Sequence, residues 1–243
     1  MGEPEVAVVV GVGPGLGAAL ALRFAKAGMN VALAARQLDR VEGIAIDCCS
    51  IDHRGRAYRV DATDEASVES LFDQVVADMG VPDLVVYNAG AFVKRGLLET
   101  TVEEFERCWR VGCLGGFLVG RAAVRRMLAR GEGGGLGGTI VFTGATASLR
   151  GSAQFHNLAV GKFGLRAVAQ SMAREFQPSG IHVAHVVIDG QIRADRPGYQ
   201  EAERGLDAVL DPGAIAETYY QLHRQPRSAW SHEVDLRPWV ERF

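Results

Sequence analysis

The sequence predicts a single-domain α/β protein in which a doubly wound parallel sheet carries helices on both faces. Apolar runs of strand length alternate with longer stretches of helical period along the whole chain. A glycine-rich turn directly joins the first of these strands to the first helix. The chain has 243 residues, 48% of them hydrophobic, and shows neither a linker nor an internal repeat, so one domain is expected.

The N-terminal part predicts a strand-helix-strand unit, with strands at Val6–Val10 and Val31–Ala35 around a helix at Gly15–Gly28. The runs are apolar at nearly every position, as in parallel strands that are buried on both faces. A parallel crossover of this kind is right-handed, so the unit starts a doubly wound sheet.

The middle of the chain continues the alternation. We expect a strand near Ala57–Val60, a helix at Glu65–Met79 and a buried strand at Leu84–Tyr87. Asp64 precedes this helix and Thr101 precedes the next one, and both supply N-cap oxygens. Two helix starts are therefore well marked.

The C-terminal half contains five further elements in the same order of strand and helix. They are a long helix from about Val102 to Ala129, a strand at Thr139–Thr143, a helix at Ala159–Phe176, a strand at Val183–Ile188 and a helix near Ala214–Leu222. Residues 225–243 form a tail with Trp230 and Trp239. Residues 131–138 include six glycines, but they follow a helix and lead into a strand, so they predict a surface loop and not a phosphate cradle.

Composition excludes several classes of partner and site. With 26 basic and 29 acidic residues, the chain has no surplus of positive charge for nucleic acid or an anionic membrane. The uncharged stretch Val6–Leu22 is interrupted by glycine and proline and lacks a basic flank, so it predicts neither a signal sequence nor a membrane span. The four cysteines form no Cys-x-x-Cys pair and the six histidines are scattered. We expect a cytoplasmic protein with reduced thiols, no metal and a small-molecule partner.

The segment Gly11-Val12-Gly13-Pro14-Gly15-Leu16-Gly17 follows the first strand and opens the first helix. Glycine permits the sharp turn and the close approach of a pyrophosphate, and the helix N-terminus attracts phosphate. This context is the one in which a glycine pattern binds a dinucleotide.

The end of the second strand indicates which dinucleotide is preferred. An acid at this point would bind the ribose 2′-hydroxyl of NAD, but the chain has Arg36, which suits a 2′-phosphate. Asp39 lies only three residues after Arg36, so NAD remains an alternative cofactor. We therefore favour NADP(H) over NAD(H).

Four features make the chain resemble the short-chain dehydrogenase/reductase family over nearly its entire length. They are the spacing Gly11-x-x-x-Gly15-x-Gly17, Asp61 after the third strand, the run Tyr87-Asn88-Ala89-Gly90, and Lys162 in the helix that follows Gly144–Asn157. The resemblance implies a Rossmann fold and a nicotinamide cofactor. It implies a cofactor-binding set of Gly11, Gly15, Leu16, Gly17, Arg36, Asp61, Asn88, Gly90, Lys162 and the backbone around Ile192.

Three catalytic positions of the family are changed in this sequence. Four residues before Lys162, where the family has its proton-donating tyrosine, the chain has Leu158. The position of the family's serine holds Ala145, and that of the relay asparagine holds Gly112. Losing a general acid typically lowers a rate by about 10²–10⁴, so ordinary ketone reduction should be poor without a substitute.

Other side chains offer substitutes for the missing proton donor. Thr143 and Thr146 flank Ala145 and carry hydroxyl groups. His156 lies two residues before the tyrosine position and titrates near neutrality, and Asp189 takes the place of the proline in the family's Pro-Gly motif. With Lys162, the histidine and the aspartate form the predicted catalytic set.

Three functions remain open at this point. The chain is an NADP(H)-dependent oxidoreductase with non-standard proton delivery to a carbonyl, imine or enone; a non-redox isomerase, lyase or cyclase on the same fold; or a non-catalytic NADP-binding protein. The resemblance also implies a substrate lid near residues 193–210. It further implies a homodimer or homotetramer built on the helices Val102–Ala129 and Ala159–Phe176.

Overall fold

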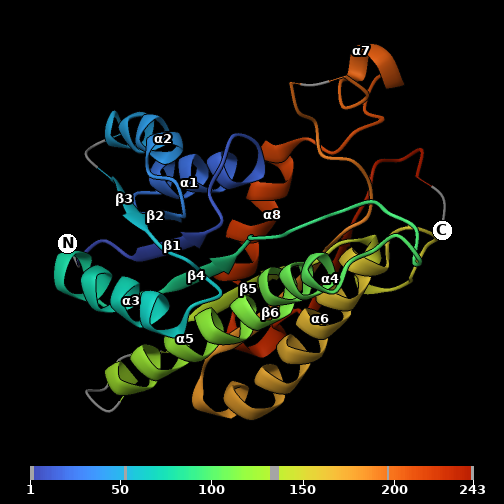
Figure 1. The fold of residues 1–243 in the computed structure, drawn as a ribbon. Helices are drawn as coiled ribbons and strands as arrows, with labels where there is room; N and C mark the ends of the chain where they lie inside the picture. The colour runs from blue at the N-terminus through green and yellow to red at the C-terminus, as the bar shows by residue number, and fades with distance from the viewer. Residues whose placement is uncertain (1–2, 52–53, 132–136, 196, 242–243) are drawn as a thin grey trace.

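The computed structural model describes residues 3–51, 54–131, 137–195 and 197–241. Its centre is a seven-stranded sheet, parallel throughout, with the order β3-β2-β1-β4-β5-β6-β7 (Figure 1). The strands are β1 (Val6–Val10), β2 (Asn30–Ala35), β3 (Gly55–Arg59), β4 (Leu84–Tyr87), β5 (Thr139–Thr143), β6 (His182–Ile188) and β7 (Glu233–Leu236). The predicted doubly wound α/β class is confirmed.

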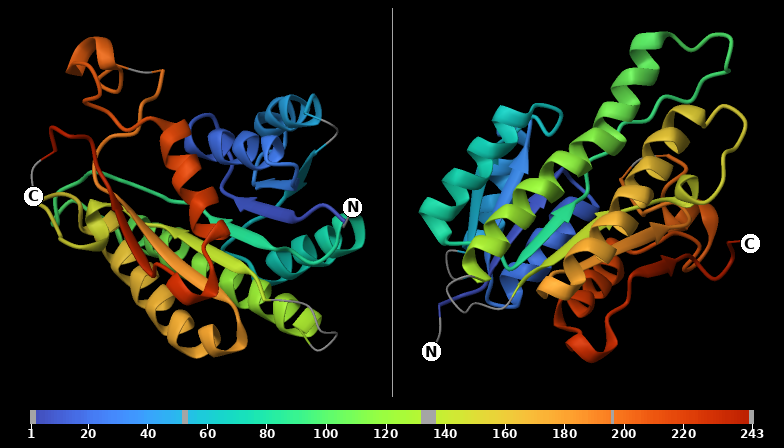
Figure 2. Two further views of the ribbon diagram at one scale, coloured as in Figure 1. Left: turned by 180° about the vertical axis from the view of Figure 1, so that it is seen from behind. Right: turned by 90° about the horizontal axis from the view of Figure 1, so that it is seen from below.

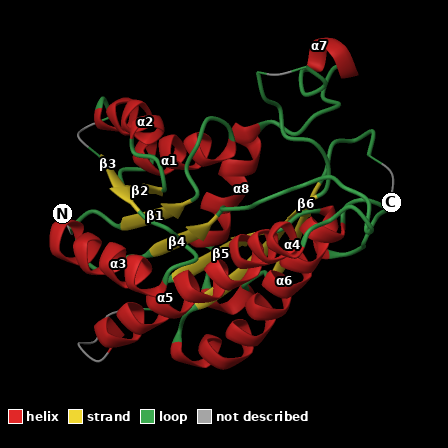
Figure 3. Cartoon of the chain, viewed as in Figure 1, coloured by secondary structure: helices red, strands yellow, loops and turns green. Residues whose placement is uncertain are grey.

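Helices cover both faces of this sheet, as Figures 1 and 2 show. One face carries α1 (Leu16–Lys26), α2 (Asp39–Cys49) and α8 (Pro212–Arg224). The other face carries α3 (Glu65–Met79), α5 (Gly115–Gly131) and α6 (His156–Phe176), with α4 (Val102–Trp109) against α6. A short helix, α7 (Glu201–Arg204), stands away from the sheet among loops (Figure 3).

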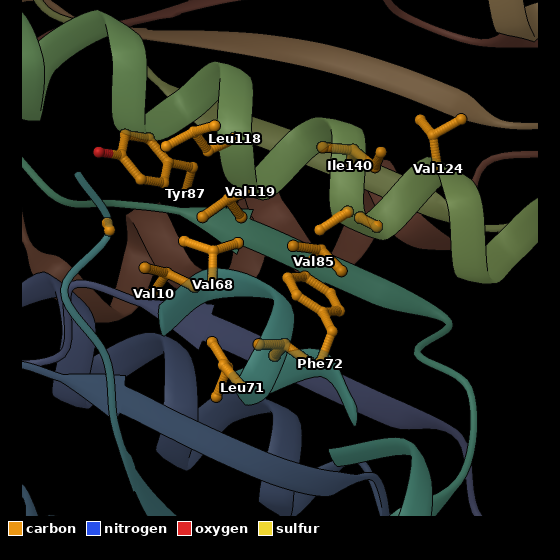
Figure 4. Close-up of a cluster of buried hydrophobic side chains, with 14 of the residues drawn as sticks. Val10, Val68, Leu71, Phe72, Val85, Tyr87, Leu118, Val119, Val124 and Ile140 are labelled. Carbon is orange, nitrogen blue, oxygen red and sulfur yellow. The ribbon is translucent and has the colours of Figure 1, made fainter. Parts of the chain in front are cut away.

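The two faces of the sheet are packed by two separate apolar clusters. Along β1, Val8 and Val10 belong to the cluster beneath α3, α5 and α6, and Ala7 and Val9 belong to the cluster beneath α1 and α8. Figure 4 shows the first cluster, where Phe72 of α3 lies near Val85 of β4. The alternation follows from the period of two of a strand, and burial on both sides explains why these strands read as unbroken apolar runs.

The predicted long helix from Val102 is interrupted in the structure. Five residues, Arg110–Leu114, form a π-helical segment, η1, between α4 and α5. The hydroxyl of the buried Tyr87 donates a 2.5 Å hydrogen bond to the carbonyl of Val111 inside η1. This side-chain bond to the irregular turn ties η1 to the end of β4.

Several boundaries and elements differ from the sequence prediction. Helix α6 begins at His156, three residues earlier than predicted, and α2 and β7 were not predicted at all. The strand β7 was missed because it is an edge strand of four residues, Glu-Val-Asp-Leu, and so lacks the continuous apolar run that marks strands buried on both faces. Most of the glycine-rich run at 131–138 lies outside the described residues.

Both predicted N-caps are confirmed. The Asp64 side chain accepts from Ala66 N at the start of α3, and Thr101 forms a reciprocal capping box with Glu104 at the start of α4. The chain order of the strands reverses between β1 and β4, and in open α/β sheets ligands bind at the carboxyl ends of the strands beside such a reversal.

Candidate functional site

A cavity of about 690 Å³ opens at the carboxyl ends of β1, β2, β3 and β4. Its walls come from the glycine turn after β1 and from the residues that follow the other three strands. The lining residues named in the sequence prediction are Gly11, Arg36, Asp61, Asn88 and Gly90. The cavity therefore brings together residues that lie nearly eighty positions apart in the sequence.

The glycine turn needs its glycines for a physical reason. Gly11 has a φ of +94°, and a Cβ built on it would lie 2.4 Å from the backbone nitrogen of Ala89. The Asn88 side chain donates a 3.0 Å hydrogen bond to the Gly11 carbonyl. Any larger residue at position 11 would push the turn away from the end of β4, so this contact holds two walls of the cavity together.

The same turn presents an open surface at the start of α1. A Cβ built on Gly13 or Gly15 meets nothing within 4 Å, and Gly15 has a φ of +121°. Gly17 packs α1 tightly onto the turn, since its added Cβ would lie 2.8 Å from Val12 Cα. In the described chain no side chain caps α1 and its first turn holds no acid, which leaves backbone N–H groups for an anion. These residues fit the diphosphate of a dinucleotide.

Two exposed arginines line the far side of the cavity. Arg36 follows β2 as predicted, and Arg40, in the first turn of α2, joins it with Gln37. Sequence reasoning missed Arg40, because α2 was not recognised, although its spacing of four residues from Arg36 was readable. Asp39, the residue that left NAD as an alternative cofactor, is not among the residues that line the cavity.

Asp61 lies on the cavity wall in an ordered turn. Its carboxylate accepts from Thr63 N at 2.9 Å and from Thr63 Oγ1 at 2.8 Å. The Thr63 backbone N–H chiefly holds the pKa of Asp61 below its ordinary value, with Arg36 and Arg110 adding in the same direction. This carboxylate is a fixed hydrogen-bond acceptor at neutral pH.

Lys162 is buried and projects from α6 towards the end of β5. Its Nζ donates a 2.6 Å hydrogen bond to the carbonyl of Thr143, and a Cβ built on Gly90 would lie 3.9 Å from the same Nζ. Burial lowers the pKa of this ammonium from 10.5 to about 8. Leu158 lies four residues earlier on α6, so the position one turn before Lys162 on this helix face is apolar.

The backbone of Gly112 in η1 lies in direct contact with the backbone of α6. A Cβ added to Gly112 would lie 3.0 Å from Gly161 Cα, and a Cβ added to Gly161 would lie 3.1 Å from Gly112 Cα. A side chain at either position would push these two backbones apart. Gly112 and the glycine that precedes Lys162 therefore pack directly against each other.

The structure separates the two threonines that flank Ala145. Thr143 Oγ1 accepts a 3.0 Å hydrogen bond from Tyr219 of α8, on the face of the sheet opposite to Lys162. Thr146 donates a 2.5 Å hydrogen bond from Oγ1 to Oδ1 of Asp189, which follows β6 and is buried. Arg237 Nη2 lies 3.5 Å from Oδ2 of the same carboxylate. Sequence reasoning missed Arg237, since it follows the unrecognised strand β7.

His156 and Ile192 lie in different surroundings. Thr100 Oγ1 donates its one proton to the Gly96 carbonyl at 2.8 Å. His156 Nε2 lies 2.9 Å from Thr100 Oγ1, so in this contact Nε2 is the donor and the threonine oxygen accepts. Ile192 pairs with Leu210 in an isolated bridge. Neither residue lines the cavity, and the same holds for Leu16.

The described part of the chain contains neither a cluster of metal-ligating side chains nor a membrane-spanning helix. No group of three or more His, Cys, Asp or Glu side chains that could hold a metal ion occurs there. Within the same residues, no helix combines the length and the apolar character needed to cross a membrane.

Comparisons with known proteins agree with this geometry. Residues 5–196 match the family model of the short chain dehydrogenases. The cis-4-hydroxycyclohexanecarboxylate dehydrogenase of Sinomonas cyclohexanicum is 33% identical over 231 residues, which cover 89% of each chain. A short-chain dehydrogenase/reductase of Armillaria gallica is 34% identical over 74% of this chain and 69% of its own length.

Solved structures give the same result for the whole chain. A short-chain dehydrogenase from Rhodopseudomonas palustris is 38% identical, with a TM-score of 0.81, over 97% of this chain and 99% of the other. An alcohol dehydrogenase from the archaeon Thermococcus sibiricus, complexed with 5-hydroxy-NADP, is 25% identical, with a TM-score of 0.85, over 99% of each chain.

Proposed function

Because this chain belongs to the short-chain dehydrogenase/reductase family, we propose that it is an NADP(H)-dependent oxidoreductase with non-standard proton delivery. One observation carries the proposal: the cavity at the end of β1 is lined by two arginines and by the glycine turn that leads into the uncapped start of α1, and the buried Lys162 lies beside its wall at Gly90. The reaction moves a hydride to or from a small organic substrate such as a carbonyl, imine or enone.

We assign the binding of the cofactor to residues from the whole edge of the sheet. The turn Gly11–Gly17, including Gly15 and Leu16, would hold the diphosphate. Arg36 and Arg40 would hold the 2′-phosphate, and Asp61 the adenine end. Asn88 and Gly90, with the backbone around Ile192, would shape the nicotinamide end, where Lys162 would bind the ribose. The nicotinamide supplies the hydride chemistry, and the protein orients it.

The proposal of NADP over NAD rests on charge at the cavity wall. Two guanidinium groups and no carboxylate from α2 face the cavity beside β2. Guanidinium groups bind phosphate with strong, charge-assisted hydrogen bonds. We therefore expect NADPH to bind more tightly than NADH.

Proton delivery in this chain differs from the family's pattern at Leu158, Ala145 and Gly112. Of the predicted substitutes, we favour Asp189 over His156. The Asp189 carboxylate is hydrogen-bonded to Thr146, directly after Ala145, whereas the Nε2 proton of His156 is held by Thr100. Lys162 would add positive charge near the reacting oxygen.

Cofactor binding and turnover test this function together. Fluorescence titration with NADPH and NADH measures both affinities. Turnover is then followed at 340 nm with NADP⁺ and two probe alcohols, cis-4-hydroxycyclohexanecarboxylate and D-threitol, which the names of two relatives give as substrates. Turnover in the reverse direction is followed with the matching ketones and with an imine and an enone. Tight NADPH binding without oxidation or reduction of any substrate would favour a non-redox or non-catalytic protein and contradict the proposal.

We also propose that the chain forms a homodimer or homotetramer through α5 and α6. Between these helices lies a groove of about 440 Å³, and the exposed apolar side chains around it include Phe117, Leu128 and, further along α6, Phe163. Apolar patches on helix faces are typical of symmetric interfaces. Light scattering at micromolar concentration tests this, and a monomer contradicts it.

A further inference from the structure

A buried carboxylate stands at the carboxyl end of β6 with partners from two other parts of the chain. Asp189 is only 5% exposed and accepts the 2.5 Å hydrogen bond from Thr146, which follows β5. Arg237, which follows β7, faces the other carboxylate oxygen at 3.5 Å and also pairs with Asp235. Three segments that are distant in sequence thus converge on one charge.

The backbone does not need this side chain. The Asp189 N–H already donates to the Leu236 carbonyl at 2.8 Å, so the strands β6 and β7 are paired without the carboxylate. A buried charge is unfavourable unless charged and hydrogen-bonding partners compensate it, and here both kinds are present. A carboxylate carries no proton and accepts hydrogen bonds only.

The charge state fixes the direction of the hydrogen bond. A threonine hydroxyl has one proton, and that of Thr146 is directed to Asp189. The half-buried Thr146 therefore offers lone pairs, not a proton, to any other neighbour. Polarising a ketone requires a hydrogen-bond donor, so a substrate oxygen beside Thr146 would meet the opposite polarity.

We propose that Thr146 and Asp189 form a base that takes the proton of a substrate hydroxyl, so that the favoured substrate is a secondary alcohol and the favoured reaction at neutral pH is its oxidation. The inference rests on the proposed oxidoreductase function. It adds a substrate class, a direction and a role for Thr146 and Arg237. Arg237 is a positioning residue, because it pairs with the Asp189 carboxylate and does not itself take the proton.

The step balances in atoms and electrons. The alcohol's O–H bond breaks and its proton goes to Thr146 Oγ1, while the Thr146 proton passes to Asp189 Oδ1. The C–H bond of the same carbon breaks and its two electrons leave as hydride to the oxidised nicotinamide, so that a C=O bond forms. The alcohol is oxidised by two electrons and the nicotinamide is reduced by two. The buried ammonium of Lys162 stabilises the negative charge that develops on the oxygen.

Two readouts test the inference on the full-length protein, and the first uses catalysis. With NADP⁺ and the two probe alcohols, Asp189→Asn and Thr146→Val should each lower kcat by about 10²–10⁴ while KM changes by less than about threefold. Thr146→Ser keeps the hydroxyl and should retain most of the rate. Asp235→Asn is the matched control, because it changes the other carboxylate that pairs with Arg237.

The second readout is binding without turnover. The protein is loaded with 1,4,5,6-tetrahydro-NADP, an unreactive analogue of the reduced cofactor, and titrated calorimetrically with cis-4-hydroxycyclohexanecarboxylate or 4-oxocyclohexanecarboxylate. The alcohol should bind about 3–10-fold more tightly than the ketone, as expected for one hydrogen bond. In Asp189→Asn the amide can donate to Thr146 and free its proton, so the preference should reverse.

The outcomes separate this inference from the proposed function. Three results would overturn the inference and leave the proposed oxidoreductase function in place. They are undiminished alcohol oxidation in Asp189→Asn, an equal or higher affinity of the wild type for the ketone, and carbonyl reduction without alcohol oxidation. Failure of the wild type to oxidise or reduce any substrate would overturn both. If Asp189→Asn does not fold, Thr146→Val provides the same kinetic test, since it leaves the ion pair with Arg237 in place.

Discussion

The contact between Gly112 and Gly161 gives the sharpest test of the geometry around Lys162. Replacing Gly112 with alanine would place a Cβ 3.0 Å from Gly161 Cα and 3.4 Å from its carbonyl carbon. Both atoms are backbone, so α6 or η1 would have to move. Overpacking of this kind typically destabilises a protein by about 1–3 kcal/mol.

A glycine-to-alanine change also acts on the intrinsic helix propensity, and a control separates the two effects. Gly43 lies on the exposed face of α2, and its added Cβ would meet nothing within 4 Å. Gly43→Ala should therefore stabilise the protein by about 0.5–1 kcal/mol. The free energy of unfolding of Gly112→Ala should lie about 1–3 kcal/mol below that of Gly43→Ala, because both changes share the propensity gain.

Urea denaturation followed by far-ultraviolet circular dichroism measures both free energies. The melting temperatures should separate in the same order, by about 2–4 °C per kcal/mol for a chain of this length. Equal stabilities of the two variants would refute the reasoning, since they would mean that α6 and η1 are not in backbone contact. Gly112→Asn should be less stable still, because its side chain is larger.

Three further predictions follow from the site. Arg36→Ala and Arg40→Ala should each weaken NADPH binding by about tenfold in fluorescence titration and leave NADH binding unchanged, and a parallel loss for both cofactors would contradict the 2′-phosphate assignment. Leu158→Tyr combined with Ala145→Ser should raise the reduction of simple activated ketones, because a phenol would again stand one turn from Lys162, and an unchanged rate with intact NADPH binding would count against the alignment. The pKa of Lys162 falls from 10.5 in the unfolded chain to about 8 in the folded protein, so between these pH values the unfolded state binds more protons and stability should rise with pH by up to about 3 kcal/mol from this group. Lys162→Met should remove that rise in urea denaturation at pH 7.5–10.5, and an identical pH profile in the variant would show that the ammonium is not desolvated.

The doubly wound fold and much of the cofactor cavity were predictable because their determinants are local. A strand that is buried on both faces is apolar at nearly every position, as β1 and β4 are. Helix starts are marked by single cap residues such as Asp64. Gly11 and Arg36 were found because each stands at a fixed distance from a strand end.

The reading of the catalytic site from sequence was only partial. It predicted Lys162 as a site residue, placed Ala145 and Leu158 at the family's serine and tyrosine positions, and named Asp189 as a candidate acid or base. It could not choose between Thr143 and Thr146, because the choice depends on which face of the sheet each hydroxyl reaches. The structure shows the Thr143 hydroxyl bonded to Tyr219 on one side and the Thr146 hydroxyl bonded to Asp189 on the other.

Sequence alone determined the alternation of strands and helices and the glycine turn, and it predicted Leu158 and Ala145 at the positions of the family's tyrosine and serine, since each depends on residues close together in the chain. The tertiary structure alone decided that Arg40 faces the cavity, that Gly112 touches Gly161, and that Arg237 meets Asp189. Arg40 depends on how α2 packs, and the other two contacts join segments about fifty residues apart. Sequence periodicity reports which face of an element is buried, but only packing determines which distant residue fills the space opposite.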